Sequence, residues 1–347
     1  MLTPQRQISV ARRAALTVSL LAASSVIAAC STFPGPLQVE LPPVTPNSSD
    51  TDPRASDPLV LDNCGFTTTI SRTPERIVTI KSTSTELLLA LGLADRIIAT
   101  AFHDGPVLDE WAAAAADIPS LGDAVPGREA LLELEPDFVF AGWESNLTVD
   151  TAGARDDLTR FGVGTYVAPS ACKGEGYRPA PMTFEKLFGD FLEAGDIFAA
   201  QDAAAALVRE QRAALDAITP STEGLSALWY SSGKATPYVG AGAGAPQMIM
   251  SAAGLKNIVA DVDDTWVSIN WERVLEANPD VIVLVDAAWN TAESKIAYFE
   301  NDAALSQLSA VVNKRYVVVP FPAAEAGVRN VDAVALIVAQ LDELAGE

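Results

Sequence analysis

The segment PERIVTIKSTSTELLLALGLADRIIAT, residues 74–100, decides the fold class. Its apolar run at residues 76–80 predicts a buried strand, and residues 85–91 predict a helix that Ser84 or Thr85 would cap. Residues 96–102 predict the next strand. Strand, helix and strand in this order are typical of an α/β domain with a parallel sheet.

The same alternation continues along the chain and falls into two sets. Further strands are predicted at residues 138–142 and 164–167, and then at 227–230, 237–239, 281–285 and 316–319. An Ala-rich helical pattern at residues 202–218 separates the sets and would be about 25 Å long. We therefore expect an α/β protein with two Rossmann-like lobes, each built on a central parallel-type sheet. The lobes would span residues 59–200 and 221–347, with a single long helix within 201–220 joining them and a ligand cleft between them.

An internal repeat supports two related lobes. The segment EALLELEPD at residues 129–137 matches ERVLEANPD at residues 272–280 with a constant offset of 143 residues. Each copy predicts a helix that ends before a Pro-Asp turn and leads into a buried strand. One lobe-sized duplication argues against a structural or adhesive surface protein, which would show repeats of roughly 20–50 residues.

The N-terminus has the pattern of a secretory signal. Arg6, Arg12 and Arg13 precede an apolar run at residues 14–29, which is too short to span a bilayer. The run ends at Ile27-Ala28-Ala29-Cys30, which resembles the lipobox of bacterial lipoproteins, so Cys30 would carry the lipid. The alternative is an ordinary cleaved signal with a chance cysteine. We expect residues 1–29 to be removed and the mature protein to be anchored on the outer face of the cytoplasmic membrane.

The segment after Cys30 predicts a disordered tether, residues 30–58. Residues 31–58 hold seven prolines and almost no large apolar side chain. Cys64 and Cys172 follow in a compartment where disulfides persist. A bond between them would close a loop of about a hundred residues, worth on the order of 4 kcal/mol. Two unpaired thiols are the alternative, and we favour the disulfide.

Composition excludes several functions. The chain has 23 Lys and Arg against 45 Asp and Glu, a net charge of −22 that becomes −25 once residues 1–29 are removed. We therefore expect no binding to nucleic acid, because such a chain repels polyphosphate. His103 is the only histidine, so a metal site with several imidazoles is impossible, and we expect no metal and no cofactor. A secreted hydrolase would need a G-x-S-x-G elbow with a later histidine, which is absent. We therefore expect a binding protein with no catalytic residue.

Several segments together resemble one family. Residues 74–100, LEPDFVFAGW, AGLKNI and WERVLEANPDVIVL are similar to the helical-backbone solute-binding proteins of ABC importers for cobalamin, siderophores and haem. The resemblance covers residues 59–347. It implies two lobes, a ligand cleft between them, limited closure about the connecting helix, and delivery of a small-molecule ligand to a permease with its ATPase. We expect a monomer.

A finer resemblance rests on four short motifs. They are DNCG at residue 62, STSTELLLALGL at 82, GWESN at 142 and APSACK at 168. Together they resemble an actinobacterial subgroup proposed to take up a deazaflavin cofactor precursor, a lactyl-phospho-deazaflavin without its glutamate tail. The alternative ligands are a corrinoid such as cobalamin, or a ferric siderophore.

The candidate ligand-binding residues come from loops at the carboxyl ends of the predicted strands, where α/β lobes bind ligands. Tryptophans in these loops would stack on a planar ligand. Arg329 and the lysines would hold a phosphodiester or carboxylate. The candidates are Lys81, Ser82, Thr85, His103, Trp143, Glu144, Lys173, Tyr230, Lys234, Trp266, Trp271, Trp289, Phe321 and Arg329. For His103, the simpler interpretation is an ordinary polar residue at the start of a loop. Trp229 lies inside a predicted strand, so a position in the core is at least as compatible with it as contact with the ligand.

Two further features concern the surface and a glycine-rich loop. In this family one acidic residue on each lobe faces the transporter, and the repeat offset pairs Asp150 with Glu293 as candidates for docking on the permease. The GAGAGA segment at residues 240–245 partly satisfies a dinucleotide fingerprint. We reject a nucleotide site because the third glycine is replaced, and we expect the loop only to let backbone approach the ligand.

Overall fold

The computed structural model describes residue 54 and residues 57–174, 176–177 and 181–346. The predicted signal peptide, Cys30 and most of the predicted tether lie outside these residues. In the part of the chain that is described, no helix is both long enough and apolar enough to cross a bilayer.

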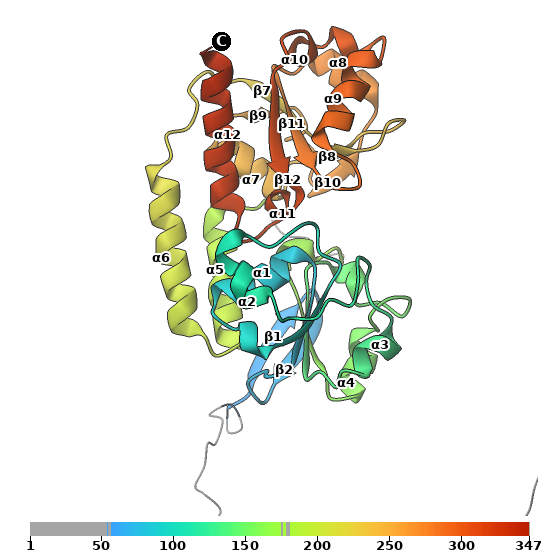
Figure 1. Cartoon of the computed structure of the whole chain (residues 1–347), viewed down its shortest axis with the longest axis vertical. Coiled ribbons are helices and arrows are strands. Elements are labelled where there is room, and N and C mark those ends of the chain that lie inside the picture. The colour runs from blue at the N-terminus through green and yellow to red at the C-terminus, as the bar shows by residue number, and fades with distance from the viewer. Residues whose placement is uncertain (1–53, 55–56, 175, 178–180, 347) are drawn as a thin grey trace, which may run out of the picture. The chain divides into compact units, whose positions relative to one another are not determined.

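The N-lobe is built on a four-stranded parallel sheet in the order β4-β3-β5-β6 (Figure 1). The strands are short, apolar and covered on both faces, as in other parallel sheets. Their bounds are β3 Ile77–Ile80, β4 Ile97–Ala101, β5 Phe138–Ala141 and β6 Gly164–Val167. The helices are α1 Ser82–Ala90, α2 Asp109–Ala115, α3 Arg128–Leu132 and α4 Arg155–Arg160. All four N-lobe strands predicted from the sequence are confirmed to within a residue at each end.

Helix α1 begins three residues before the predicted start. Lys81 occupies the N-cap with φ 86°, and the hydroxyls that were expected to cap the helix lie inside it. Ser84 Oγ donates to Ile80 O at 2.6 Å, and Thr85 Oγ1 donates to Lys81 O at 3.1 Å. These hydroxyls bond carbonyls of the preceding turn, so they compete less with the helix than their propensity suggests.

The C-lobe sheet is mixed, with a parallel centre and an antiparallel edge. Strands β7, β11 and β12 are parallel, whereas β8 and β10 run antiparallel at one edge. A turn through Gly233, with φ 90°, joins β7 directly to β8 and leaves no room for a crossover helix. The strands are β7 Ser226–Ser232, β8 Tyr238–Gly240, β9 Lys256–Asn257, β10 Trp266–Ser268, β11 Val281–Asp286 and β12 Tyr316–Pro320.

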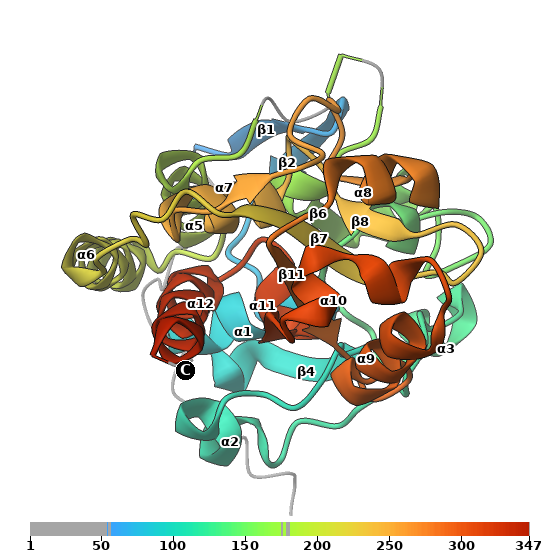
Figure 2. The same cartoon turned by 90° about the horizontal axis from the view of Figure 1, so that it is seen from above.

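Helices cover both faces of this sheet (Figure 2). Alternate residues of β11 show the two environments: Val283 packs in the cluster that contains helices α7 and α12, and Leu284 packs in the cluster that contains α8, α9 and α10. The helices are α7 Ala245–Ala252, α8 Trp271–Ala277, α9 Ala292–Asn301, α10 Ser309–Val312, α11 Phe321–Ala324 and α12 Asn330–Ala345.

Two helices run between the lobes. The expected connecting helix is α6, Gln201–Ala217, and α5, Phe184–Ile197, lies beside it (Figure 1). The segment before α5 is held to the C-lobe by Met182 N, which donates to Ala243 O at 2.9 Å. The residue after α5 is held to the N-lobe by Arg96, which donates to Phe198 O at 2.8 Å. The chain therefore passes from one lobe to the other along α5 and returns along α6.

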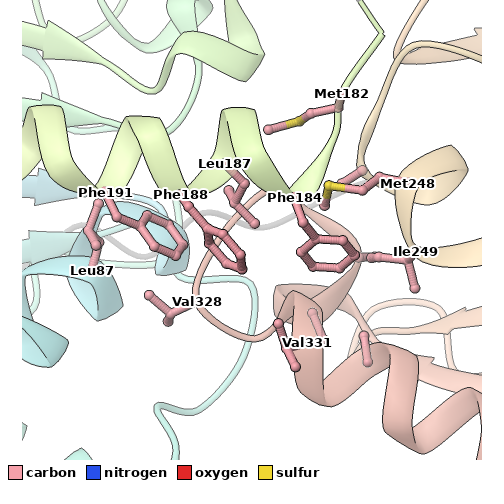
Figure 3. Close-up of a cluster of buried hydrophobic side chains, with 14 of the residues drawn as sticks. Leu87, Met182, Phe184, Leu187, Phe188, Phe191, Met248, Ile249, Val328 and Val331 are labelled. Atoms are coloured by element: carbon pink, nitrogen blue, oxygen red, sulfur yellow. The ribbon is translucent and has the colours of Figure 1, made fainter. Parts of the chain in front are cut away.

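The apolar face of α5 joins the cores of the two lobes. Figure 3 shows Phe191 near Leu87 of α1, and Phe184 near Met248 and Ile249 of α7, with Phe188 between them along α5. All of them belong to one buried cluster, to which Val331 of α12 also belongs. A shared core of this kind resists large hinge motion, because separating the lobes would expose apolar surface, which costs about 25 cal/mol of free energy per Å². Limited closure about the connecting helix stays a prediction.

The repeated Pro-Asp turns have the same structural role in both lobes. Asp137 Oδ1 accepts a hydrogen bond from Arg76 N at 2.9 Å, just before β3. Asp280 Oδ2 accepts one from Ser226 N at 2.8 Å, at the start of β7. Each aspartate precedes a central strand and ties it to the beginning of the neighbouring strand, so equivalent residues make equivalent contacts. The two copies of the repeat are thus alike in structure as well as in sequence.

A hairpin of β1, Leu59–Asn63, and β2, Phe66–Ile70, was not predicted. Buried Arg155 fastens it to the lobe by donating to Asn63 O at 2.7 Å and to Thr68 Oγ1 at 3.0 Å. The turn of the hairpin carries Cys64, whose Cα lies 5.1 Å from that of Cys172. This spacing is within the range that a disulfide requires.

Candidate ligand-binding cleft

The main candidate site is a cleft of about 870 Å³ lined by both lobes. Its volume suits a drug-sized or larger organic ligand. The lining comes from residues that follow β3, β4, β5 and β6 in the N-lobe, and from residues at or after the carboxyl ends of β7, β11 and β12 in the C-lobe, where α/β lobes bind ligands. Strands β8 and β10 and the start of α7 complete the wall.

Eight of the fourteen candidate binding residues line this cleft. They are Lys81, His103, Trp143, Glu144, Lys173, Trp266, Trp289 and Phe321. The remaining lining residues were not among the candidates; they are Phe102, Asp104, Gly105, Asp123, Ser145, Ser170, Ala171, Ser231, Ser232, Tyr238, Gly244, Ala245, Thr265, Ala288, Glu325 and Ala326. Most of these lie in the predicted loops, where position in the chain does not reveal which side chains turn inward.

Lys81 lies on the floor of the cleft. Its ammonium pairs with the Asp104 carboxylate and faces the rings of Trp143, Phe102 and Phe321, with Nζ 3.7, 4.4 and 5.1 Å from the ring centroids. Burial lowers the pKa of Lys81 to about 8, and the negative charge of Glu325 opposes this. The lysine is therefore a cation held among aromatic faces, a recognised favourable arrangement.

The backbone around Lys81 is closely packed and has unusual dihedral angles. A Cβ at Gly142, the first residue after β5, would lie 2.6 Å from the Cβ of Lys81. Only glycine fits there without moving the lysine. Lys81 itself has a positive φ of 86°, and Phe102, at the end of the neighbouring strand, has one of 54°. Non-glycine residues in this conformation carry strain, and such residues cluster at functional sites.

Aromatic side chains from both lobes form the cleft walls. Trp143 and Phe102 of the N-lobe pack edge to face with centroids 5.6 Å apart. In the C-lobe, Trp266 stacks on Tyr238 at 5.8 Å with an interplanar angle of 17°. Trp289 is 65% exposed. It meets Phe321 edge to face, so it presents a free aromatic surface at the cleft.

Lys173 connects the lobes at the wall of the cleft. Its Nζ donates to Thr265 Oγ1 at 2.7 Å and to Asp264 Oδ1 at 3.1 Å, both in the C-lobe. Its backbone N–H donates to Glu144 Oε2 at 2.6 Å. Since Lys173 directly follows Cys172, the contact between Cys172 and Cys64 also holds this lysine in place.

Acidic side chains outnumber the lysines in the lining of the cleft. The cleft has two lysines and four carboxylates, those of Asp104, Asp123, Glu144 and Glu325. Burial raises the pKa of Glu325, while Lys81 and a hydrogen bond from Trp143 Nε1 at 3.4 Å oppose the rise. The charges of the two lysines in the lining are therefore already balanced by carboxylates. Apart from Glu144, the sequence did not single out these carboxylates, because the chain has 45 Asp and Glu residues.

Arg329 does not line the cleft, although it was expected to hold the ligand. Its guanidinium makes a two-pronged pair with the Glu86 carboxylate of α1, in which Nε donates to Oε2 at 2.8 Å. It also donates to Pro106 O at 2.7 Å. Arg329 is 7% exposed and Glu86 is 1% exposed. The arginine therefore joins the C-lobe to the N-lobe instead of facing a ligand.

Five other candidates lie behind the wall or away from it. Ser82 Oγ accepts from Asp104 N at 2.8 Å, and Thr85 Oγ1 lies 3.0 Å from His103 Nε2, so both hold cleft residues in place. Burial lowers the pKa of His103, and the charge of Lys81 adds to this. The other three, Tyr230, Lys234 and Trp271, form a cluster around the β7–β8 turn, where Trp271 Nε1 donates to Lys234 O at 2.7 Å.

The glycine-rich segment is mainly a packing device. A Cβ at Gly242 would lie 2.1 Å from Ala260 O, and one at Gly244 would lie 2.8 Å from Thr265 O. The segment therefore packs backbone to backbone against residues 260–265. Among the described residues, no group of three or more His, Cys, Asp or Glu side chains is placed to hold a metal ion.

The chain is similar in sequence to a known protein family and to a protein of Bacillus subtilis. Residues 77–323 match the profile of a family described as periplasmic binding protein. The chain is similar to the uncharacterized ABC transporter substrate-binding lipoprotein YvrC of Bacillus subtilis. The two are 24% identical over 281 residues, which cover 77% of this chain and 79% of that protein.

Two solved structures have the same fold. A periplasmic binding protein from Veillonella parvula matches with a TM-score of 0.73 and 24% identity, over 82% of this chain and 97% of its own. An ABC-type Fe3+-hydroxamate transport system protein from Saccharomonospora viridis matches with a TM-score of 0.70 and 27% identity, over 82% of this chain and 99% of its own. Both likenesses cover the two lobes that enclose the cleft.

Proposed function

We propose a ligand for the cleft from the premise that this chain belongs to the periplasmic binding protein family. That ligand is an anionic aromatic small molecule. The protein is a substrate-binding protein of an ABC transporter. Proteins of this kind bind and deliver solutes without chemical change, so we assign no catalytic residue. Our specific candidate for the ligand is a lactyl-phospho-deazaflavin precursor.

The observation that carries the proposal is the aromatic lining of the cleft. Six aromatic side chains from both lobes line it: Phe102, Trp143, Tyr238, Trp266, Trp289 and Phe321. Offset stacking on such rings favours a planar heterocycle. A deazaflavin has a flat tricyclic ring that would fit between these walls.

The polar lining suits the remainder of such a ligand. Hydroxyls of a sugar-like chain can donate to Glu144 and exchange hydrogen bonds with Ser170 or Ser231. Lys173, beside Thr265, can turn one of its N–H groups to a phosphodiester oxygen. The four carboxylates of the cleft disfavour a ligand that is anionic throughout. A flat neutral ring with one anionic tail therefore agrees better with the lining than a polyanion.

Thermal unfolding of the purified protein with candidate ligands tests this assignment. At a hundredfold excess over Kd, the deazaflavin phosphodiester is expected to stabilise the protein by about 2.7 kcal/mol, a shift of several degrees in Tm. Cobalamin and a ferric hydroxamate should leave Tm unchanged. A shift with either of these and none with the deazaflavin would reject the ligand assignment while keeping the transport role.

A ferric siderophore is the second candidate. The likeness to the Fe3+-hydroxamate transport protein of Saccharomonospora viridis favours it. Among the described residues, the lining offers Lys81 and Lys173 as cations against four carboxylates, which suits a neutral ferric hydroxamate better than an anionic complex.

We place the protein on the outer face of the cytoplasmic membrane, held by a lipid on Cys30 and acting as a monomer. The similarity to a substrate-binding lipoprotein supports this location. Docking on the permease would use Asp150 and Glu293, which are both exposed. Complementary charges of this type chiefly set orientation and the rate of association.

A further inference from the structure

We propose that the Lys81–Asp104 pair recognises a ring edge on which an N–H group stands beside a carbonyl. This inference rests on the proposed function and deepens it by naming the group that the cleft selects. The class of ligand is a planar heterocycle with a lactam or imide edge, such as the pyrimidinedione of a flavin or deazaflavin.

The first observation is an unused acceptor on Asp104. Its side chain is 2% exposed, and Oδ1 receives the Lys81 ammonium. The second oxygen, Oδ2, is buried and has no hydrogen-bond partner. Among the described residues that line the cleft, no other has a buried polar side-chain atom without a partner. Leaving such an acceptor unpaired costs free energy, so it points to a donor that arrives with the ligand.

The second observation is an unused donor on Lys81. An ammonium has three N–H groups, and in the described part of the protein Asp104 is the only acceptor that hydrogen-bonds to this one. The others face aromatic rings, of which Trp143 is the nearest at 3.7 Å. The pair therefore offers one acceptor and one donor side by side, beneath rings that favour a flat partner.

The position of the pair selects an edge rather than a face of the ligand. Trp143 belongs to the N-lobe and Phe321 to the C-lobe, and both rings face Lys81 Nζ. A flat ring that parts these two side chains would stack against them and bring its edge to the pair. Ser82 holds the backbone of Asp104 at 2.8 Å, so the acceptor is already oriented. A ring N–H would donate to Asp104 Oδ2 while the adjacent carbonyl accepted from Lys81.

Calorimetric titration of the full protein with 5-deazariboflavin and with its N3-methyl derivative tests the inference. Methylation removes the ring N–H and keeps the aromatic surface. We expect the methyl derivative to bind at least tenfold more weakly. Asp104→Asn should weaken 5-deazariboflavin at least tenfold and reduce the preference between the two compounds to less than threefold. Asp117→Asn, at an exposed position outside the cleft, should leave both affinities unchanged.

The outcomes separate the inference from the proposed function. If wild-type protein binds both compounds equally well, the pair does not read the N–H edge, although a deazaflavin remains the ligand. If neither compound binds, the pair does not hold the ring edge and the inference fails, while the deazaflavin assignment is decided separately by the thermal-unfolding test with the phosphodiester. The comparison of the two ligands needs only wild-type protein, so a folding defect in Asp104→Asn, checked by circular dichroism, cannot hide the result.

Discussion

Replacing Arg329 with methionine is expected to lower the free energy of unfolding by about 3–5 kcal/mol, because it leaves Glu86 buried without its partner. The pair joins α1 of the N-lobe to the residue that precedes α12 of the C-lobe. Its side chains are 9% and 1% exposed. Urea denaturation followed by circular dichroism would measure the loss.

The sign of the pH dependence provides a second readout of the same variant. Burial raises the pKa of Glu86 above its ordinary value, and Arg329 opposes the rise. Without the arginine the folded-state pKa rises further, so the variant is stabilised relative to its own value at pH 8 when the pH falls toward 5 and Glu86 takes up a proton. The deficit against wild type should therefore shrink at lower pH.

The matched control is the double variant Glu86→Gln with Arg329→Met. Replacing both partners removes the lone buried charge, and we expect this double variant to regain most of the lost stability. A loss below about 1 kcal/mol in Arg329→Met, or no recovery in the double variant, would contradict the assignment of this pair as a buried link between the lobes.

Loss of the bond between Cys64 and Cys172 is the second large effect. The two cysteines are 108 residues apart. By chain entropy a bond that closes such a loop stabilises the folded state by about 4–5 kcal/mol. The variant Cys64→Ser with Cys172→Ser should lose an amount of this order in urea denaturation. Because Lys173 follows Cys172 and bridges to Thr265, the ligand affinity of the variant should fall as well.

A reductant provides the control for this prediction. Wild-type protein denatured with dithiothreitol should match the double serine variant, and dithiothreitol should not change the variant itself. If alkylation and mass spectrometry find two free thiols in wild-type protein, or if reductant leaves its unfolding curve unchanged, the cysteines are not paired.

Much of the architecture could be predicted from apolar patterning. Buried strands such as β11 are continuous apolar runs, in that case from Val281 to Val285, and the spacing of such runs reveals both lobes. The β1–β2 hairpin was not predicted because the sequence of β2, FTTTI, is short and largely polar. The antiparallel edge of the C-lobe sheet was not predicted because its outer strand, β10, has only three residues. Helix α5 was not singled out as a connection, since its role depends on what its phenylalanines contact in space.

The location of the cleft was predictable, whereas its individual side chains were only partly so. Topology placed the loops, and Trp143 and Lys173 lie in the wall as expected. Arg329 lies in one of those loops but turns to Glu86, a partner 243 residues away that no local pattern reveals. Asp104 was overlooked for a different reason: in a chain with 45 acids a carboxylate carries little signal until its burial is known.

The central claim is that the solute occupies the cleft between the lobes, and a plugged cleft tests it most directly. Ala288 is exposed and lines the cleft, so Ala288→Trp fills it without disturbing a core. Ala112→Trp places the same ring at an exposed position of α2 outside the cleft. In calorimetric titration with the deazaflavin phosphodiester, we predict at least a tenfold loss of affinity for Ala288→Trp and wild-type affinity for Ala112→Trp. Equal binding by both variants, or no binding by wild-type protein, would contradict the account.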